Sequence, residues 1–350
     1  MNASRRVLFG LSILLTQSDC RRPIESVDCT QERPTTPGDH GCQVPEFADR
    51  DFILHIPSGY SGQAMPLVIA MHGAGGNKEG MNPITCPDGN LDSPNCLSKV
   101  SDREGFLLVY PDGTSMGNVL NGRSWSQGGG GSRSLRCENA CQQGVDDVAY
   151  FSALLDTVAR VLPYDPKRVY VTGFSNGAGM SHRLACELPN RIAAIAPVGG
   201  ANQFAGAAAC VASRPIPILH IHGDEDRCWP YAGGLGSCVD SQQTSGAYVS
   251  VAESTVGIAG YPGWITRYGC LMTPNVESLA DTMSDGTTTS KSTYSGCRGG
   301  VSVMLYTVAG AGHTWPGGNQ YLSESRIGKT SRDFSASTAI WDFFKPLAIP

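Results

Sequence analysis

Short apolar runs alternate with helical patterns along most of the chain. Apolar residues at helical spacing predict a helix from 148 to 162, opening at Asp146 and Asp147, which are good residues for a helix start. Residues 181–188 and 336–344 also have a helical pattern. Six apolar runs end in glycine and polar residues, and we expect each to be a buried strand: 67–71, 106–110, 169–172, 192–198, 216–221 and 303–308.

This alternation predicts the class of fold. Continuously apolar strands that alternate with helices are typical of an α/β protein, in which helices cover both faces of a mostly parallel sheet. Ligands bind such sheets at the carboxyl ends of the strands. Since every predicted strand ends in glycine and polar residues there, we expect the functional site at that edge.

The first part of the chain has a different pattern. Residues 21–46 are polar, contain prolines and show no periodicity, which predicts a linker. We expect one folded catalytic domain over residues 47–350. Residues 1–20 have the form of a secretory signal peptide, because Arg5 and Arg6 precede a short apolar stretch from 7 to 15. The arginine pair also loosely matches a twin-arginine signal.

Cys20 stands immediately after this apolar stretch, where a bacterial lipoprotein carries its acylated cysteine. Two locations therefore remain open: a secreted, extracellular protein, or one held at the bacterial cell envelope by a lipid anchor at Cys20. The chain has 13 cysteines, a number typical of exported proteins, and twelve remain without Cys20. Pairing these by proximity gives Cys29–Cys42, Cys86–Cys96, Cys137–Cys141, Cys186–Cys210, Cys228–Cys238 and Cys270–Cys297.

Composition excludes several classes of protein. Only 16% of the 350 residues are charged, and the net charge of −5 comes without a basic stripe, which argues against nucleic acid as a partner. No apolar run reaches the roughly 18 residues that a membrane span needs. No glycine-rich phosphate loop of the Walker type occurs, and we expect no cofactor and no metal.

Residues 173–177, Gly-Phe-Ser-Asn-Gly, match the pattern G-x-S-x-G between a predicted strand and a predicted helix. In this context the pattern is typical of a nucleophile elbow, whose tight turn requires glycines and raises the serine hydroxyl above the sheet. Ser175 is therefore the candidate nucleophile. The backbone N–H of Asn176 is expected to bind the oxyanion that forms during acyl transfer.

A serine nucleophile needs a base and an acid that orients it, in the chain order serine, acid, histidine. His313, in a glycine-rich loop after the last predicted strand, is the candidate base. Two aspartates follow the strand 216–221. We favour Asp226 as the acid and expect Asp224 to cap the turn. The second oxyanion donor is expected to be the backbone N–H of Ala74, in the loop 72–76.

The elbow, the His-Gly-Ala-Gly-Gly loop at 72–76, the segment 222–231 and the run Gly-His-Thr-Trp-Pro-Gly-Gly at 312–318 together resemble the polyhydroxybutyrate depolymerase and feruloyl esterase family of secreted α/β-hydrolases. The resemblance covers about residues 47–350. It implies an α/β-hydrolase fold and a carboxylic ester hydrolase that works through an acyl-enzyme. Its substrate would be an ester, including polyhydroxybutyrate or hydroxyalkanoate oligomers and feruloyl or acetyl esters of plant polysaccharides.

This sequence departs from the family pattern at Cys228 and at the cysteines 137 and 141, which affects the shape of the substrate pocket. Trp125, Trp315 and Tyr231 are expected to line the cleft, with Trp229 a similar candidate. The alternative for the tryptophans is packing in the core. We expect the segment 228–300 to be a loop excursion beside the cleft, with Cys270–Cys297 holding it.

Two other functions remain as alternatives. His220 and His222 faintly resemble a zinc-binding pattern, which favours a zinc-dependent hydrolase, although the closing histidine is missing. A non-catalytic surface protein on the same fold would bind its partner without chemistry. Such proteins usually lack a member of the triad, and all three are present here.

Overall fold

The computed structural model describes residues 24–117, 121–128, 137–204, 207, 210, 213–237 and 247–350. The strands in this part of the chain are β1 (Ser26–Val27), β2 (Gly38–Gln43), β3 (Asp51–Ile56), β4 (Met65–Met71), β5 (Leu107–Pro111), β6 (Thr114–Ser115), β7 (Arg123–Ser124), β8 (Tyr164–Phe174), β9 (Ala194–Val198), β10 (Ile218–Gly223), β11 (Gly257–Ile258), β12 (Tyr261–Pro262), β13 (Asn275–Ser278), β14 (Thr288–Tyr294) and β15 (Val303–Ala309). The α-helices are α1 (Lys78–Thr85), α2 (Leu97–Glu104), α3 (Glu138–Gln142), α4 (Asp147–Val161), α5 (Asn176–Glu187), α6 (Val251–Thr255), α7 (Trp264–Tyr268), α8 (Glu324–Ile327) and α9 (Ala336–Phe344).

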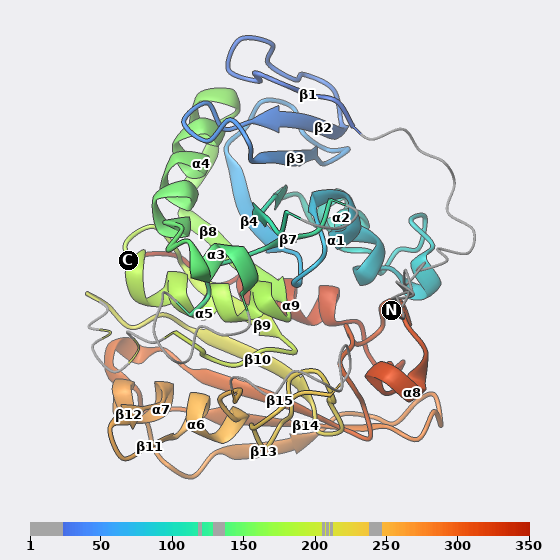
Figure 1. Cartoon of the computed structure of the whole chain (residues 1–350), viewed down its shortest axis with the longest axis vertical. Helices are drawn as coiled ribbons and strands as arrows, with labels where there is room; N and C mark the ends of the chain where they lie inside the picture. Colours follow the sequence, from blue (N-terminus) through green and yellow to red (C-terminus); the bar gives the residue numbers. More distant parts are fainter. Residues whose placement is uncertain are drawn as a thin grey trace, which may run out of the picture.

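A single large sheet runs through the described part of the molecule, in the order β1-β2-β3-β5-β4-β8-β9-β10-β15-β14-β13 (Figure 1). The six neighbouring strands β5, β4, β8, β9, β10 and β15 pair in parallel. Antiparallel strands extend this parallel centre on both sides, β2 and β3 at one edge and β13 and β14 at the other. All six predicted strands fall in the parallel centre.

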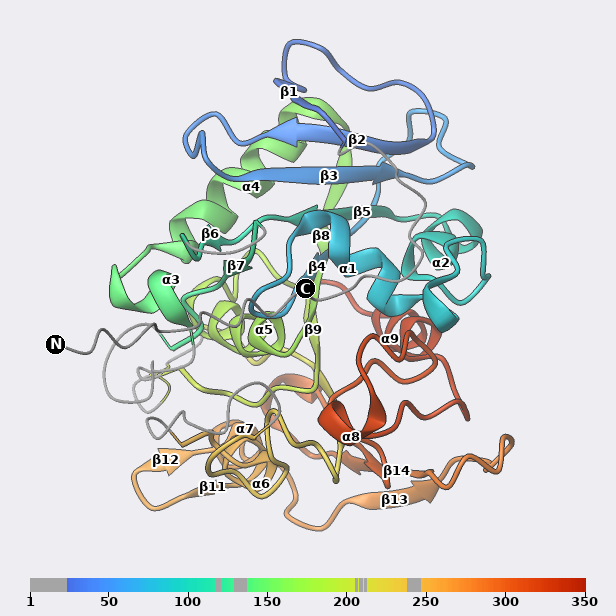
Figure 2. The same ribbon diagram turned by 45° about the vertical axis from the view of Figure 1, so that its right-hand side comes forward.

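Helices cover both faces of the sheet (Figure 2). On one face, α4, α5 and α7 pack their apolar residues against the strands, including Phe151, Leu184 and Trp264. On the other face α1, α2 and α9 do so, through residues such as Met81, Val100 and Trp341. This arrangement, with the parallel centre, is the α/β-hydrolase architecture expected from the sequence, and the fold class is confirmed.

The helix boundaries follow local signals. The helix α4 begins where it was predicted, because the side chain of Asp146 accepts a hydrogen bond of 3.0 Å from the backbone N–H of Ala149. The helix α9 has the predicted bounds, 336–344. The helix α5 begins at Asn176, five residues before the expected start at 181. Its first turn was missed because it contains Gly177 and Gly179 and has no apolar residues at helical spacing.

The predicted linker differs from the structure. Within 21–46, residues 38–43 form β2, which pairs antiparallel with β3, and residues 26–27 form β1 beside it. The disulfide Cys29–Cys42 ties the two strands together. This part of the chain therefore belongs to the folded domain, and the expected domain start near Phe47 is wrong. The predicted signal peptide and Cys20 lie outside the described residues.

The segment 228–300 is more than the predicted loop excursion. Its described part contains α6, α7 and the hairpin of β13 and β14, and β14 pairs with β15 along its whole length. The hairpin thus extends the central sheet. The disulfide Cys270–Cys297 links the residues just after α7 to the segment between β14 and β15.

Five disulfides lie within the described residues, and they are the expected pairs Cys29–Cys42, Cys86–Cys96, Cys137–Cys141, Cys186–Cys210 and Cys270–Cys297. Cys228 is also disulfide-bonded. Its expected partner, Cys238, lies outside the described residues. Among the helices of the described part, none has the length and apolar character to cross a membrane.

Candidate active site

Ser175 occupies a sharp turn between β8, which ends at Phe174, and α5, which begins at Asn176. Its backbone has φ 57° and ψ −115°, a conformation that costs free energy for a residue with a side chain. The flanking glycines permit the turn by close approach. A Cβ atom on Gly173 would lie 2.5 Å from the carbonyl of Gly177, and one on Gly177 would lie 2.5 Å from the carbonyl oxygen of Met71.

The structure places His313 beside this turn. The imidazole of His313 lies against the ring of Phe174, the residue before Ser175, with 4.7 Å between ring centroids. Gly199, directly after β9, lies close to both Phe174 and His313. A Cβ atom on Gly199 would lie 3.2 Å from the ring of Phe174 and 3.4 Å from Nδ1 of His313. The backbone N–H of Ser175 donates to the carbonyl of Val198 in the same strand. The carboxyl ends of β8, β9 and β15 therefore converge here.

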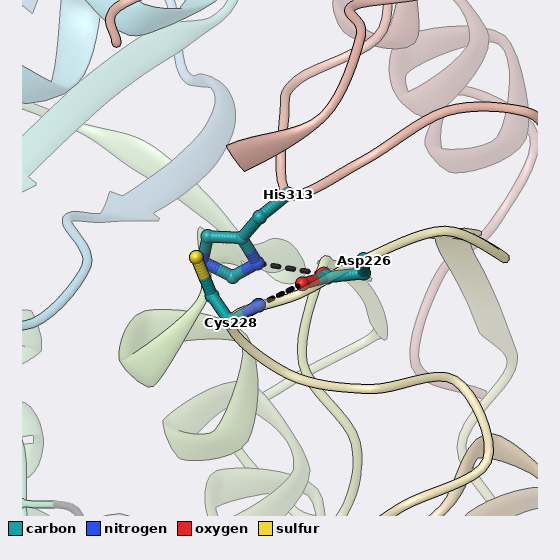
Figure 3. A group of neighbouring side chains, drawn as sticks. All are labelled: Asp226, Cys228 and His313. Atoms are coloured by element: carbon teal, nitrogen blue, oxygen red, sulfur yellow. Dashed lines mark hydrogen bonds and ion pairs between the residues drawn. The ribbon is translucent and has the colours of Figure 1, made fainter. Parts of the chain in front are cut away.

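Asp226 is the aspartate that contacts His313. Its Oδ2 lies 2.7 Å from Nδ1 of His313, and its Oδ1 accepts a hydrogen bond of 2.8 Å from the backbone N–H of Cys228 (Figure 3). Oδ1 also accepts a hydrogen bond of 2.8 Å from the backbone N–H of Trp229. Asp224 is exposed and accepts a hydrogen bond of 2.7 Å from the N–H of Gly310, as expected for a residue that caps the turn.

The side chain of Asp226, with its carboxyl group, is fully buried. Burial raises its pKa, but the neighbouring His313 and the hydrogen bonds from His222 and His313 outweigh burial and lower the pKa to about 2. Asp226 is thus an ionised, buried carboxylate that orients the imidazole of His313.

A second buried histidine also contacts Asp226. Nε2 of His222 lies 2.9 Å from the carbonyl oxygen of Trp229 and 3.3 Å from Oδ2 of Asp226. Both partners are acceptors, so Nε2 carries a proton and donates. Nδ1 of His222 and Nε2 of His220 are hydrogen-bonded to each other, at 3.1 Å. Burial lowers the pKa of His220 well below its usual value.

These contacts bear on the metal alternative. His220 and His222 are hydrogen-bonded to each other, and both are buried. Among the described residues, the group whose ligand atoms lie close enough for a metal ion is Asp226, Cys228 and His313 (Figure 3). The sulfur of Cys228 is disulfide-bonded and cannot act as a thiolate ligand, and Asp226 and His313 bind each other. This set of donors does not fit a metal ion.

The loop 72–76 reaches the elbow from the end of β4. Nδ1 of His72 donates to the carbonyl of Gly73 at 2.8 Å, and its Nε2 accepts from the N–H of Gly113 at 3.1 Å. Burial lowers the pKa of His72 to about 4, so the ring is neutral. His72 therefore shapes the loop, as its place in the motif indicates. Ala74 is exposed at the tip of the loop, and a Cβ atom on Gly73 would lie 3.2 Å from Cβ of Ser175.

The tryptophans differ from the prediction. Trp125 and Trp315 are both fully buried, so neither presents a surface to a substrate. The indole N–H of Trp315 donates to the hydroxyl of Ser337, and that of Trp229 donates to the carbonyl of Val249. The alternative of core packing applies to them. Tyr231 is half-buried, and its hydroxyl pairs with that of Thr307 at 2.8 Å.

A cavity of about 850 Å³ lies away from this site, on the face of the sheet beside α9. Tyr306, Phe334 and Phe343 are among its lining residues, whereas Ser175, Asp226 and His313 are not. The candidate catalytic groups are instead gathered at the carboxyl edge of the sheet.

Comparison with known proteins shows which family this chain resembles. Residues 50–217 match the family model described as "Esterase PHB depolymerase". Feruloyl esterase B of Piromyces equi is 28% identical over 306 residues, which are 86% of this chain and 46% of that protein. A putative esterase, NocK, of Nocardia uniformis subsp. tsuyamanensis is 28% identical over 330 residues, 92% of this chain and 84% of the relative. The chain therefore resembles the polyhydroxybutyrate depolymerase and feruloyl esterase family, and the family model matches it over residues 50–217.

These relatives are named as esterases, and the expected resemblance to this family of carboxylic ester hydrolases is confirmed. The chain spans about half the length of the Piromyces relative. Among solved structures, the acetyl xylan esterase of Aspergillus awamori is similar with a TM-score of 0.47 and 17% identity, over 76% of this chain and 89% of that chain.

Sequence reasoning missed contacts that two residues, His222 and Asn176, make at the candidate site. His222 was considered only as a zinc ligand, although its spacing from His220 puts both side chains on one face of β10, a signal of shared surroundings. The side-chain amide of Asn176 also has a structural role, since it binds the backbone of Trp125. No local pattern joins residues so far apart in the chain.

The lowered pKa of Asp226 makes a prediction for acid stability. Because the native state binds the proton of Asp226 more weakly than the unfolded chain does, its ionised carboxylate stabilises the fold above pH 4, and this contribution of about 2 kcal/mol is lost as the pH falls from 4 towards 2. Asp226→Asn removes it, so the free energy of unfolding should depend less steeply on pH in that range. Urea denaturation at several pH values measures this, with the exposed Asp224→Asn as the control. A variant as pH-dependent as the wild type would contradict the assignment.

Proposed function

We propose that this protein is a serine esterase in which Ser175, His313 and Asp226 form a catalytic triad. The observation that carries the proposal is the 2.7 Å contact between Nδ1 of His313 and the buried carboxylate of Asp226, beside the strained turn at Ser175. Since Nδ1 donates to the carboxylate, Nε2 is left to accept the proton of a hydroxyl group.

The reaction follows from these positions. The hydroxyl of Ser175 attacks the ester carbonyl as Nε2 of His313 takes its proton, and the resulting imidazolium is stabilised by the ionised Asp226. The backbone N–H groups of Asn176 and Ala74 bind the oxyanion. Collapse of the tetrahedral intermediate expels the alcohol with the proton from His313, and leaves an acyl-enzyme. Water, activated by His313, then releases the acid.

The proposed substrates are feruloyl or acetyl esters of plant polysaccharides. The names of the relatives support this choice over polyester oligomers, since they include feruloyl esterase B of Piromyces equi and a bifunctional acetylxylan esterase/xylanase of Neocallimastix patriciarum, which is 31% identical over 181 residues, 22% of its length. We further propose that the chain is exported after removal of its N-terminal signal, so that the mature protein begins at residue 20 or 21. The five described disulfides support export, because they form in oxidising compartments.

Replacing the nucleophile tests the triad. Ser175→Ala should lower kcat for p-nitrophenyl acetate by about 10⁴ or more and abolish labelling by a fluorophosphonate probe, with little change in the thermal midpoint. Ser278→Ala, on the exposed strand β13, serves as the control and should keep both. Hydrolysis retained by a folded Ser175→Ala protein would refute the proposed function.

The substrate class has its own test. Values of kcat/KM should be higher for methyl ferulate and acetylated xylan than for hydroxybutyrate oligomers, with p-nitrophenyl acetate as the reference ester. The reverse order would overturn the assignment to polysaccharide esters and leave the esterase mechanism in place.

Expression of the whole chain in a bacterium tests export. Mass spectrometry should find a mature protein that lacks the residues before position 20 or 21. An acyl mass on Cys20 would identify the lipid-anchored form, and an unmodified start after Cys20 the secreted form. A full-length cytoplasmic protein as the main product would contradict export.

A further inference from the structure

Trp125 contacts both segments that supply the proposed oxyanion hole. It lies just after β7, fully buried, and its ring is 5.2 Å from that of Phe151 and 4.9 Å from that of His72. Three polar groups of this residue, its backbone N–H, its backbone carbonyl and its indole N–H, each have a partner near the elbow. Such a set of partners is more than core packing requires.

The first two groups hold Asn176. The backbone N–H of Trp125 donates to Oδ1 of Asn176 at 2.7 Å, and Nδ2 of Asn176 donates to the carbonyl of Trp125 at 3.0 Å. This pair of hydrogen bonds between a side-chain amide and a peptide fixes the residue that opens α5. The backbone N–H of Asn176 is one of the helix's first N–H groups, which have no partner within the helix. Its direction is thus set by the two bonds to Trp125.

The third group holds the other segment. The indole N–H of Trp125 donates to the carbonyl of His72 at 3.0 Å, at the start of the loop that carries Ala74. The next carbonyl, that of Gly73, accepts from Nδ1 of His72 at 2.8 Å and from the N–H of Gly76 at 3.0 Å. Because a peptide unit is planar and trans, fixing the carbonyl of Gly73 directs the N–H of Ala74 the opposite way.

Trp125 is itself held firmly. The N–H of the following residue, Ser126, donates to the buried carboxylate of Asp147 at 2.5 Å. Asp147 pairs with Arg50 at 2.6 Å, and the guanidinium of Arg50 lies over the rings of Tyr150 and Trp125. The segment is therefore a rigid support between the loop and the helix.

An oxyanion hole works only if two donors from separate parts of the chain lie at hydrogen-bond distance from one oxygen. We propose that Trp125 is a positioning residue that holds the backbone N–H groups of Ala74 and Asn176 at the spacing the oxyanion requires. The proposal rests on the proposed function. Trp125 touches no substrate in this account, and acts through the two peptides that it braces.

The experiment compares Trp125→Phe with Trp341→Phe. Both remove the indole N–H of a buried tryptophan, but Trp341 lies in α9, away from the site, and donates to Glu104 at the end of α2. Trp125→Phe should lower kcat for p-nitrophenyl acetate about 10- to 100-fold, with KM within about twofold, since a displaced donor weakens transition-state binding. Affinity for a boronic acid, whose adduct with Ser175 imitates the tetrahedral intermediate, should fall by a similar factor. Trp341→Phe should change neither, even where it lowers the thermal midpoint equally.

Asn176→Ala is a second test, because it removes the two hydrogen bonds between Asn176 and Trp125 but keeps the indole and every backbone N–H. It should also reduce kcat and boronate affinity together, and it replaces Trp125→Phe should that variant not fold. A folded Trp125→Phe or Asn176→Ala protein with wild-type boronate affinity would overturn the inference while Ser175-dependent hydrolysis stands. A wild-type protein without Ser175-dependent hydrolysis would overturn the proposed function, and this inference with it.

Discussion

The site at the C-terminal ends of the strands depends on the contacts of one buried carboxylate, that of Asp226. An ionised carboxylate removed from water must be satisfied by donors, and this one has four: two backbone N–H groups, His222 and His313. A turn with two N–H groups directed at Oδ1 leaves Oδ2 for the histidines. His222, which is hydrogen-bonded in turn to its own buried neighbour His220, completes the set. The result is an imidazole of His313 whose orientation is fixed before any substrate arrives.

The same principle of prior orientation applies at the nucleophile. The positive φ of Ser175 is a strained conformation, and β8, β9 and α5 hold it through close packing of glycines and the bond from Ser175 to Val198. The loop at 72–76 is shaped by His72 and by Trp125. The proposed acid, base, nucleophile and oxyanion donors come from loops after four strands, β4, β8, β10 and β15, or from the helix α5 that follows β8. The parallel sheet brings them together because its carboxyl ends meet at one edge.

The sequence predicted the parts of this molecule that local patterns determine. Apolar runs located all six central strands, and G-x-S-x-G located the elbow because only glycines fit at 173 and 177. The strand β2 was missed because its residues, 38–43, are polar and contain two glycines, and its place depends on pairing with β3 and on Cys29–Cys42. Trp125 was assigned to the cleft because a sequence does not tell which way an aromatic ring points. Its contacts with His72 and Asn176 join residues about 50 positions away on either side.

A crystal structure of the protein with a boronic acid or phosphonate bound covalently to Ser175 tests the central claim most directly. The account predicts that one oxygen of the adduct lies about 2.7–3.1 Å from the backbone nitrogens of both Ala74 and Asn176, with Nε2 of His313 in hydrogen-bond contact with the adduct. An adduct oxygen bound by other groups, or an imidazole of His313 turned away from Ser175, would contradict it.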